Sequence, residues 1–373
     1  MESIYKPLGE LAERVDERNR DGAVTTLLGV SIDKCFMPSV ANVIGTDLTK
    51  YKIIRHDEFA VSLMQVSRDE KIPVACLKDY DIAIMSPAYS IFRVKAGADV
   101  LPDYLALWFA RKEFDREATF IAVGGVRGSM SWEDFARMQI LVPPIDVQRK
   151  LVYDYKVISD RIALKRRIDR NLEAQVQTMF DNLFMKQQPD GQLQDIAEIN
   201  PNRKLSKNCV AQCFDMATLP TVGCIPVGGV KKAYNGGMRF MNGDIILARI
   251  TPCLENGKAA YINILANDEV AFGSTEYIVL SPKPSLPSSF LYFLVRNSEF
   301  ITFAIKHMNG SSGRQRVSGD NLAAFPIKMP QKDALEEFDK FASRVLSQMR
   351  LSSMEIQKLS EVRRMIMARL SHC

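Results

Sequence analysis

The chain repeats itself at half its own length, and this repeat constrains the fold more than any other feature. Residues 121–143 align without a gap with residues 308–330, an offset of 187 in a chain of 373 residues. The alignment places Ser131 opposite Ser318 and ends on a proline in both copies. Because self-similarity at a fixed spacing marks a duplicated structural unit, the sequence predicts two similar domains rather than one large core.

Three further pairs of segments share this spacing and extend the repeat over most of the chain. The paired segments are 104–114 with 290–300, predicted as short amphipathic helices, and 58–64 with 244–250 and 83–94 with 270–282, predicted as strands. Few positions are identical, so the evidence for duplication is the common offset of four separate segments.

After the repeated loop, each half continues into a long segment with a heptad pattern. Residues 146–184 and 333–370 contain no glycine or proline, and apolar side chains recur at two positions of each heptad. At 1.5 Å per residue, each helix would be roughly 60 Å long, which exceeds the usual length of a domain helix. We therefore predict an antiparallel coiled coil, the alternative being that each helix packs on its own domain. The predicted interface contains Leu151, Ile158, Ile162, Leu172 and Val176 with Val345, Met349, Ile356, Leu359 and Ile366.

The middle of the predicted interface is polar. Lys165 and Asp169 occupy heptad positions that are otherwise apolar, and in-phase antiparallel pairing would place them near Ser352. A polar group in a coiled coil can fix the register at some cost in stability. We interpret these side chains as a register device.

These patterns define the fold class and the domain order. We predict an α+β chain in which two similar α/β domains are separated by two long helices in an antiparallel coiled coil, with a pseudo-two-fold internal repeat. The predicted boundaries are 1–145 for the first domain, 146–188 for the first helix, 189–330 for the second domain and 331–373 for the second helix.

Charge and cysteine usage limit the environment and the partners. The net charge is +5, and the sequence pI is about 8.7, which permits a nucleic-acid partner without requiring one. We expect neither a signal peptide nor a membrane span, because no apolar run is long enough. Seven cysteines without a C-x-x-C pair indicate reduced thiols in a cytoplasmic protein. A metal site that uses Cys209, Cys213 and Cys224 is the weaker interpretation.

Motifs for chemistry are few. The chain has three histidines, and its glycine-rich segments match neither the P-loop nor the dinucleotide-binding pattern. Residues 142–145 read Val-Pro-Pro-Ile, which lacks the polar and aromatic residues of an amino-methyltransferase motif. Residues 69–71 read Asp-Glu-Lys, a weak nuclease-like triplet without a clear acidic partner. One alternative for the function of the chain is a divergent DNA methyltransferase or nuclease with its own active site; the other, DNA recognition without catalysis, depends on the polar loops.

Polar loops rich in arginine, glycine and serine are the remaining candidates for a site. Guanidinium groups can read guanine, and serine, asparagine and lysine can contact phosphates. We interpret the repeated Arg127 and Arg314 as scaffold and the unrepeated Arg316, together with Lys231 and Lys232, as the better base-reading residues. The full set of candidate DNA-binding residues is Arg316, Arg314, Lys231, Lys232, Asn235, Ser312, Arg127 and Ser129.

The ordered motifs resemble those of the DNA-specificity (S) subunits of Type I restriction–modification systems. The resemblance is carried by residues 271–282, 311–330 and 124–152 and by the two spaced helices. It covers essentially the whole chain and is weaker in the first half, where "MSPAYSIFRV" stands in place of the Phe-Gly-Ser-Thr-Glu pattern.

The resemblance implies a non-catalytic subunit. Each globular domain would be a target recognition domain that reads one half of a bipartite site in double-stranded DNA. The helices would act as a spacer and would dock modification (methyltransferase) subunits, two in number, and restriction subunits. No cofactor is expected in this chain, since S-adenosylmethionine, ATP and Mg would be bound by the partner subunits, and no membrane partner is expected.

Overall fold

The chain is divided into two compact units, which we describe separately. A computed structural model describes residues 4–39, 45–64, 66–123, 128–311 and 313–370. The first unit comprises Met1–Asp160 with Ser360–Cys373, and the second comprises Arg161–Leu359.

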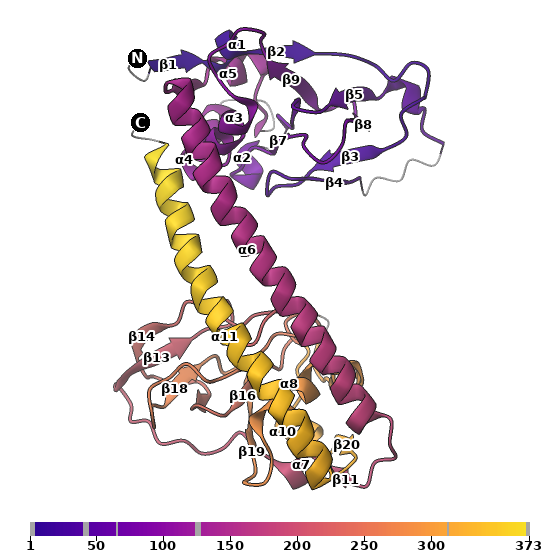
Figure 1. Cartoon of the computed structure of the whole chain (residues 1–373), viewed down its shortest axis with the longest axis vertical. Coiled ribbons are helices and arrows are strands. Elements are labelled where there is room, and N and C mark those ends of the chain that lie inside the picture. Colours follow the sequence, from indigo (N-terminus) through magenta and orange to yellow (C-terminus); the bar gives the residue numbers. More distant parts are fainter. Residues whose placement is uncertain (1–3, 40–44, 65, 124–127, 312, 371–373) are drawn as a thin grey trace. The chain divides into compact units, whose positions relative to one another are not determined.

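The first unit combines two four-stranded sheets and a two-stranded pair with helices (Figure 1). Its strands are β1 (Ile4–Pro7), β2 (Ala12–Val15), β3 (Leu27–Val30), β4 (Phe36–Pro38), β5 (Lys52–Arg55), β6 (Phe59–Val61), β7 (Val74–Cys76), β8 (Ile82–Met85), β9 (Ser90–Val94) and β10 (Gln139–Val142). Its helices are α1 (Leu8–Leu11), η1 (Leu48–Lys50), α2 (Val66–Asp69), α3 (Pro102–Phe109), α4 (Lys112–Ala122), α5 (Trp132–Arg137) and the start of α6 (Ile145–Phe180).

One sheet of the first unit lies between the helices and the other sheet. Its strand order is β2-β9-β6-β7, and that of its neighbour is β4-β3-β8-β5, where β3 and β8 are parallel. Phe59 and Phe92 point to the helical side and pack with Phe109 of α3, whereas Ala60 and Ile91 belong to the core between the sheets. Alternate residues of a strand face opposite sides, so both faces of this sheet are covered by apolar groups.

The second unit contains a matching set of elements. Its strands are β11 (Gly191–Gln192), β12 (Ala197–Ile199), β13 (Val210–Phe214), β14 (Val230–Ala233), β15 (Arg239–Phe240), β16 (Ile245–Ala248), β17 (Ala259–Tyr261), β18 (Ala271–Gly273), β19 (Tyr277–Pro282) and β20 (Pro326–Ile327). Its helices are the end of α6, the π-helical η3 (Asp181–Met185), α7 (Leu193–Ile196), α8 (Ser288–Arg296), α9 (Ser298–Lys306), α10 (Gly319–Ala323) and the start of α11 (Lys332–Arg369).

The two units share one topology, which confirms the internal repeat. The sheets of the second unit have the orders β12-β19-β16-β17 and β14-β13-β18-β15, strand for strand those of the first unit. The parallel pair β3–β8 recurs as β13–β18, and the closing pair β1–β10 recurs as β11–β20. The repeated serines have the same role, because Ser131 and Ser318 each cap a short helix by accepting a hydrogen bond from a backbone N–H at 3.0 Å.

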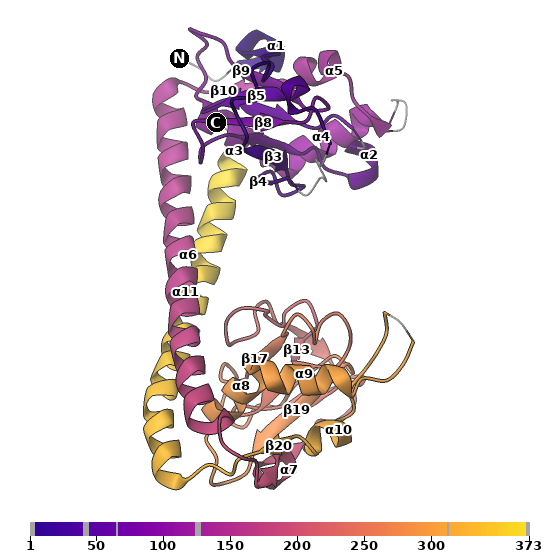
Figure 2. The ribbon, with the colours of Figure 1, turned by 90° about the vertical axis from the view of Figure 1, so that its right-hand side faces the viewer.

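Two details of the predicted elements are wrong. Residues 83–94 and 270–282 each form two strands that belong to different sheets, so each apolar run crosses from one sheet to the other. Residues 104–114 and 290–300 each span the end of one helix and the start of the next. In the second copy the side chain of Asn297 accepts hydrogen bonds from Glu299 N and Phe300 N, which starts α9 as a separate helix (Figure 2).

The long helices pair in opposite directions within each unit. α6 has 36 residues and α11 has 38. In the first unit the guanidinium of Arg363 lies 5.9 Å from the ring centre of Tyr155. In the second unit both Arg161 and Lys165 form ion pairs with Glu355. Residue numbers fall along α11 as they rise along α6, which confirms the predicted antiparallel pairing.

The long helices also pack on the domains. Coiled-coil pairing and packing on a domain, the two alternatives considered for them, therefore each describe a different part of the helices. Phe180 of α6 and Phe338 of α11 are fully buried in the main core of the second unit, with ring centres 5.6 Å apart. Leu151 and Ile366 belong to the helical core of the first unit. The ends of the helices thus complete domain cores, and only the middle depends on helix–helix contacts.

The polar middle lies where the heptad pattern predicts. Asp169 is buried and hydrogen-bonds with Ser352, and Lys165 lies 2.6 Å from Glu355 Oε2. Burial raises the pKa of the Asp169 carboxyl, although the bond with Ser352 and the charge of Lys165 act to lower it. At neutral pH the charged carboxylate of Asp169 therefore lowers the free energy of unfolding.

We expect Asp169→Asn to stabilise the second unit at pH 7, with the gain fading in acid. Asparagine retains an acceptor for Ser352 but carries no charge. An acid whose pKa is raised on folding destabilises above that pKa, and it has no effect well below the ordinary value of 3.8, where both states are protonated. Urea unfolding of both proteins between pH 4 and 7 measures the difference. A variant that is less stable than wild type at pH 7 would contradict this account.

A second polar group fixes α6 onto the second unit. Glu173 Oε1 accepts a hydrogen bond from the Tyr292 hydroxyl and lies 3.2 Å from Arg296 Nη2. Arg296 also donates to the carbonyl oxygens of Gly257 and Thr221, at 2.7 and 3.0 Å. All of its partners lie inside the unit, and burial raises the pKa of Tyr292 well above its ordinary value. Glu173, Tyr292 and Arg296 thus form a buried polar network in which each side chain has a hydrogen-bond or ion-pair partner.

Candidate nucleic-acid interface

Most of the candidate DNA-binding residues lie on two elements of the second unit. One is the segment 309–317, which we call the arginine strap, between α9 and α10. The other is the ribbon formed by β13 and β14 with the turn that follows it. Both present exposed polar side chains next to ordered backbone, which suits recognition by loops on a rigid scaffold.

Backbone hydrogen bonds hold the arginine strap in place. Asn309 and Arg316 exchange two N–H···O bonds of 2.9 Å, which closes the strap on itself. Val317 N donates to Arg249 O at 3.0 Å, and Thr251 N donates to Gln315 O at 3.1 Å. The strap is thereby fixed along the end of β16.

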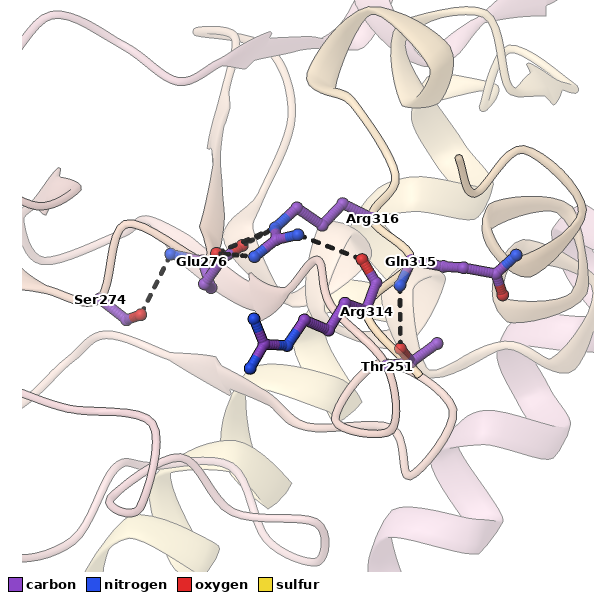
Figure 3. A network of polar contacts seen from close by, with 6 residues as sticks. All are labelled: Thr251, Ser274, Glu276, Arg314, Gln315 and Arg316. Atoms are coloured by element: carbon purple, nitrogen blue, oxygen red, sulfur yellow. Dashed lines mark hydrogen bonds and ion pairs between the residues drawn. The ribbon is translucent and has the colours of Figure 1, made fainter. Parts of the chain in front are cut away.

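Arg316 is committed to an ion pair within the protein (Figure 3). Its Nε donates to both carboxylate oxygens of Glu276 at 2.9 Å, and its Nη2 donates to Oε1 at 2.8 Å. Its Nη1 donates to the carbonyl oxygen of Arg314 at 3.1 Å. The hydrogen bonds from Arg316 lower the pKa of Glu276 below its ordinary value. This guanidinium holds the strap against the start of β19.

Arg314 has the opposite character. Its side chain is exposed, and its guanidinium forms neither a hydrogen bond nor an ion pair with any residue that the structure describes. The geometry thus differs from the predicted arrangement, because Arg316 is engaged within the protein and Arg314 is available, while the DNA-reading role of each stays a prediction. The repeat offers a reason that the prediction missed: at the offset of 187, Glu276 and Arg316 correspond to Tyr89 and Ser129, so both partners of the ion pair are replaced together.

The β13–β14 ribbon presents two lysines. Lys231 and Lys232 lie on β14 opposite Gln212 and Ala211, and every residue of β14 is exposed. Asn235 follows in the turn and is also exposed. The ribbon is supported from behind by the edge-to-face contact of Tyr234 with Phe272, whose ring centres are 5.2 Å apart.

The turn after this ribbon requires glycine. Gly237 has φ +104°, and a Cβ atom at this position would lie 1.9 Å from the carbonyl oxygen of Gly273. The turn therefore approaches β18 more closely than any side chain allows, which fixes where Asn235 is presented.

The remaining predicted DNA-binding residues are less informative. Arg127 and Ser312 lie outside the described residues. Ser129 is half-buried in the first unit, in the copy of the loop that corresponds to the arginine strap. The roles of all these residues in DNA binding stay predictions.

All of the residues predicted for the helix pair are buried or half-buried. Leu151, Ile162, Val176, Val345, Met349 and Ile366 are buried, and Ile158, Leu172, Ile356 and Leu359 are half-buried. They are divided between the helix–helix contact and the two domain cores.

The weaker chemical interpretations gain no geometric support. Among the described residues, no group of three or more His, Cys, Asp or Glu could hold a metal ion. Cys224 lies in the core, where burial raises the pKa of its thiol to about 12, so it is a poor thiolate ligand. Asp69 is paired with Arg68, and Lys71 with Asp33, which separates the charges of the nuclease-like triplet. In the part of the chain described here, no helix is long and apolar enough to span a membrane.

Sequence reasoning missed one group of exposed charges. Arg166, Arg167 and Arg170 project from the middle of α6, and no described residue pairs with them. The sequence contains this group of charges as "KRRIDR", residues 165–170. A heptad pattern describes only the apolar positions of a helix, so it gives no information on the charges of the outer face.

Comparisons with known proteins agree with this architecture. Residues 188–362 match the family described as Type I restriction modification DNA specificity domain. The EcoEI specificity subunit of Escherichia coli is 32% identical over 149 residues, which are 37% of this chain and 24% of that protein. The EcoAI specificity subunit of Escherichia coli is 31% identical over 190 residues, which are 47% of this chain and 31% of that protein.

A solved structure shows that the fold is shared over nearly the whole chain. The crystal structure of a Type I restriction-modification system S subunit from M. genitalium matches with a TM-score of 0.62 at 11% identity, covering 99% of this chain and 96% of that one. This chain spans less than a third of the length that the two curated relatives have. Residues 188–362 are therefore similar to the Type I restriction modification DNA specificity domain, and the duplicated fold around them is that of a solved S subunit.

Proposed function

We propose that this chain is the sequence-specific DNA-binding subunit of a Type I restriction–modification complex and that it recognises a bipartite target in double-stranded DNA. The first recognition domain would be residues 1–145 and the second residues 189–330. The observation that carries this proposal is the duplication of one fold with different exposed loops. β14 presents Lys231 and Lys232, whereas its counterpart β4 reads Phe-Met-Pro. Two modules that read different sequences need a common scaffold and different contact residues.

The chain would direct partner subunits rather than perform chemistry. Methyl transfer from S-adenosylmethionine would belong to two modification subunits, and ATP- and Mg-dependent cleavage to restriction subunits, all assembled in the cytoplasm. The two Escherichia coli relatives support this division, since each is a specificity subunit. The docking surface for partners would include the two long helices, whose outer faces carry exposed apolar side chains such as Tyr153 and Leu351.

Mapping DNA methylation in the host, with and without the gene, tests the proposed function. We expect one motif with two specified parts and a fixed unspecified spacer to lose its methylation when the gene is deleted and to regain it when the gene is restored. Purified chain incubated with S-adenosylmethionine and DNA serves as a control and is expected to transfer no methyl groups. An unchanged methylation pattern after deletion, or methyl transfer by the chain alone, would reject the proposal.

A further inference from the structure

A cluster of three arginines on α6 has no counter-charge among the residues that the structure describes. Arg166, Arg167 and Arg170 are exposed, and none lies within ion-pair distance of a described carboxylate. Arg166 and Arg170 are one helical turn apart on the same face, and Arg167 is adjacent to both. We call these three residues the α6 basic cluster.

The carboxylates that could neutralise the cluster are already occupied. Asp169 is buried and bonded with Ser352, and Glu173 is buried with Tyr292 and Arg296. Glu355 is engaged by both Arg161 and Lys165. The positive charge of the cluster is therefore directed to solvent and not to a structural ion pair.

The cluster is also not part of the repeated scaffold. At the offset of 187, its three positions correspond to Ser353, Met354 and Gln357 of α11. Since α11 forms an equivalent long helix without these arginines, helix formation and pairing do not require them. They are an addition to the first copy.

The distribution of charge over the chain indicates what the cluster serves. Residues 1–145 contain 18 Lys and Arg against 21 Asp and Glu, a net charge of −3. Residues 146–188 contain 9 against 6, and residues 189–330 contain 14 against 11, so each has a net charge of +3. The net charge of the first domain is negative and does not attract a polyanion, whereas the net charge of residues 146–188 is positive and does.

We propose that the α6 basic cluster binds the phosphate backbone of the double-stranded DNA target, independently of its sequence. This inference rests on the proposed function and adds a contact outside the recognition loops. Guanidinium groups pair with phosphate through two parallel hydrogen bonds, which makes three free arginines on one helical surface a suitable backbone clamp. Because such contacts displace counterions, they contribute to affinity without selecting bases.

The test compares the salt dependence of DNA binding in two variants of equal charge. One carries Arg166→Gln, Arg167→Gln and Arg170→Gln. The control carries Lys306→Gln, Lys340→Gln and Arg344→Gln, three exposed basic residues without an ion pair among the described residues. Each full chain is purified with its methyltransferase subunits. Binding to a target duplex and to a duplex with one altered half-site is measured between 50 and 200 mM salt, with thermal unfolding as a check of folding.

We expect the cluster variant to lower the slope of log affinity against log salt by about two to three, close to 0.9 for each phosphate contact, while the control stays near wild type. The affinity for both duplexes is expected to fall by the same factor, so discrimination is unchanged. A slope equal to that of wild type overturns the inference, as does weakened assembly with the methyltransferase subunits, which indicates an acidic protein surface as the partner. If the wild-type complex does not distinguish the two duplexes, the proposed function fails instead.

Discussion

Replacing Glu173 by alanine is expected to destabilise the second unit by about 3–5 kcal/mol, because the change leaves a buried guanidinium without its carboxylate. The side chains of Glu173 and Arg296 are only 12% and 14% exposed, so water cannot take the place of the missing oxygens. Tyr292 would lose one of its two acceptors as well and keep the carbonyl oxygen of Gly223. The loss is measured as a lower urea midpoint for the unfolding of the full chain.

Two further variants separate the buried charge from other effects. Glu173→Ala combined with Arg296→Met removes both charges, and we expect it to recover much of the lost stability, because an apolar pair of similar volume carries no desolvation cost. Glu355→Ala removes a carboxylate from the neighbouring helix. Its partners are the well-exposed Arg161 and the partly exposed Lys165, so water can replace the lost oxygens and we expect a much smaller change. If Glu173→Ala alone is as stable as Glu355→Ala, the buried network of Glu173, Tyr292 and Arg296 does not anchor α6.

Replacing Lys231, Lys232 and Arg314 by alanine is expected to weaken binding to the DNA target about 100-fold or more. These side chains are exposed on the ribbon and the arginine strap, and each direct contact with a base contributes about 1–3 kcal/mol. The loss concerns one half of the motif, since all three residues belong to the second unit. Binding of duplexes altered in either half-site measures it, together with the methylated motif in the host.

Arg316→Ala provides the matched comparison for this prediction. It removes the ion pair with Glu276 and loosens the strap, so we expect faster amide hydrogen exchange across residues 309–317. The triple variant is expected to keep wild-type exchange in the same segment. If the triple variant bound DNA like wild type, the reading surface would have to lie elsewhere on the unit.

The sequence predicts the architecture well because it is encoded in periodic patterns. The heptad spacing locates the long helices within a few residues, and it places Asp169 beside Ser352 before any coordinates are known. The half-length offset predicts a duplicated fold even where identities are few. Both signals are sums over many positions, which makes them insensitive to single substitutions.

The roles of individual arginines cannot be derived in the same way. The role of Arg316 depends on Glu276, which lies 40 residues away in the sequence and meets it only because β19 and the strap are adjacent in the fold. Exposure of Arg314 is likewise set by the path of the strap. Comparing the two halves of the sequence points to this loop, but it cannot tell which of the two arginines is engaged within the protein and which is exposed.

The closing pairs β1–β10 and β11–β20 have a consequence for how such chains change. In the second unit the antiparallel pair joins Gly191 to Ile327, so the polypeptide enters and leaves the globular part about one strand spacing, some 5 Å, apart. A segment with adjacent ends behaves as a cassette: recombination can exchange it for a homologous one while the flanking helices keep their sequence and their pairing. Under the proposed function, one such exchange would replace one half of the binding specificity, without the many coordinated point mutations that a discontinuous reading surface would need.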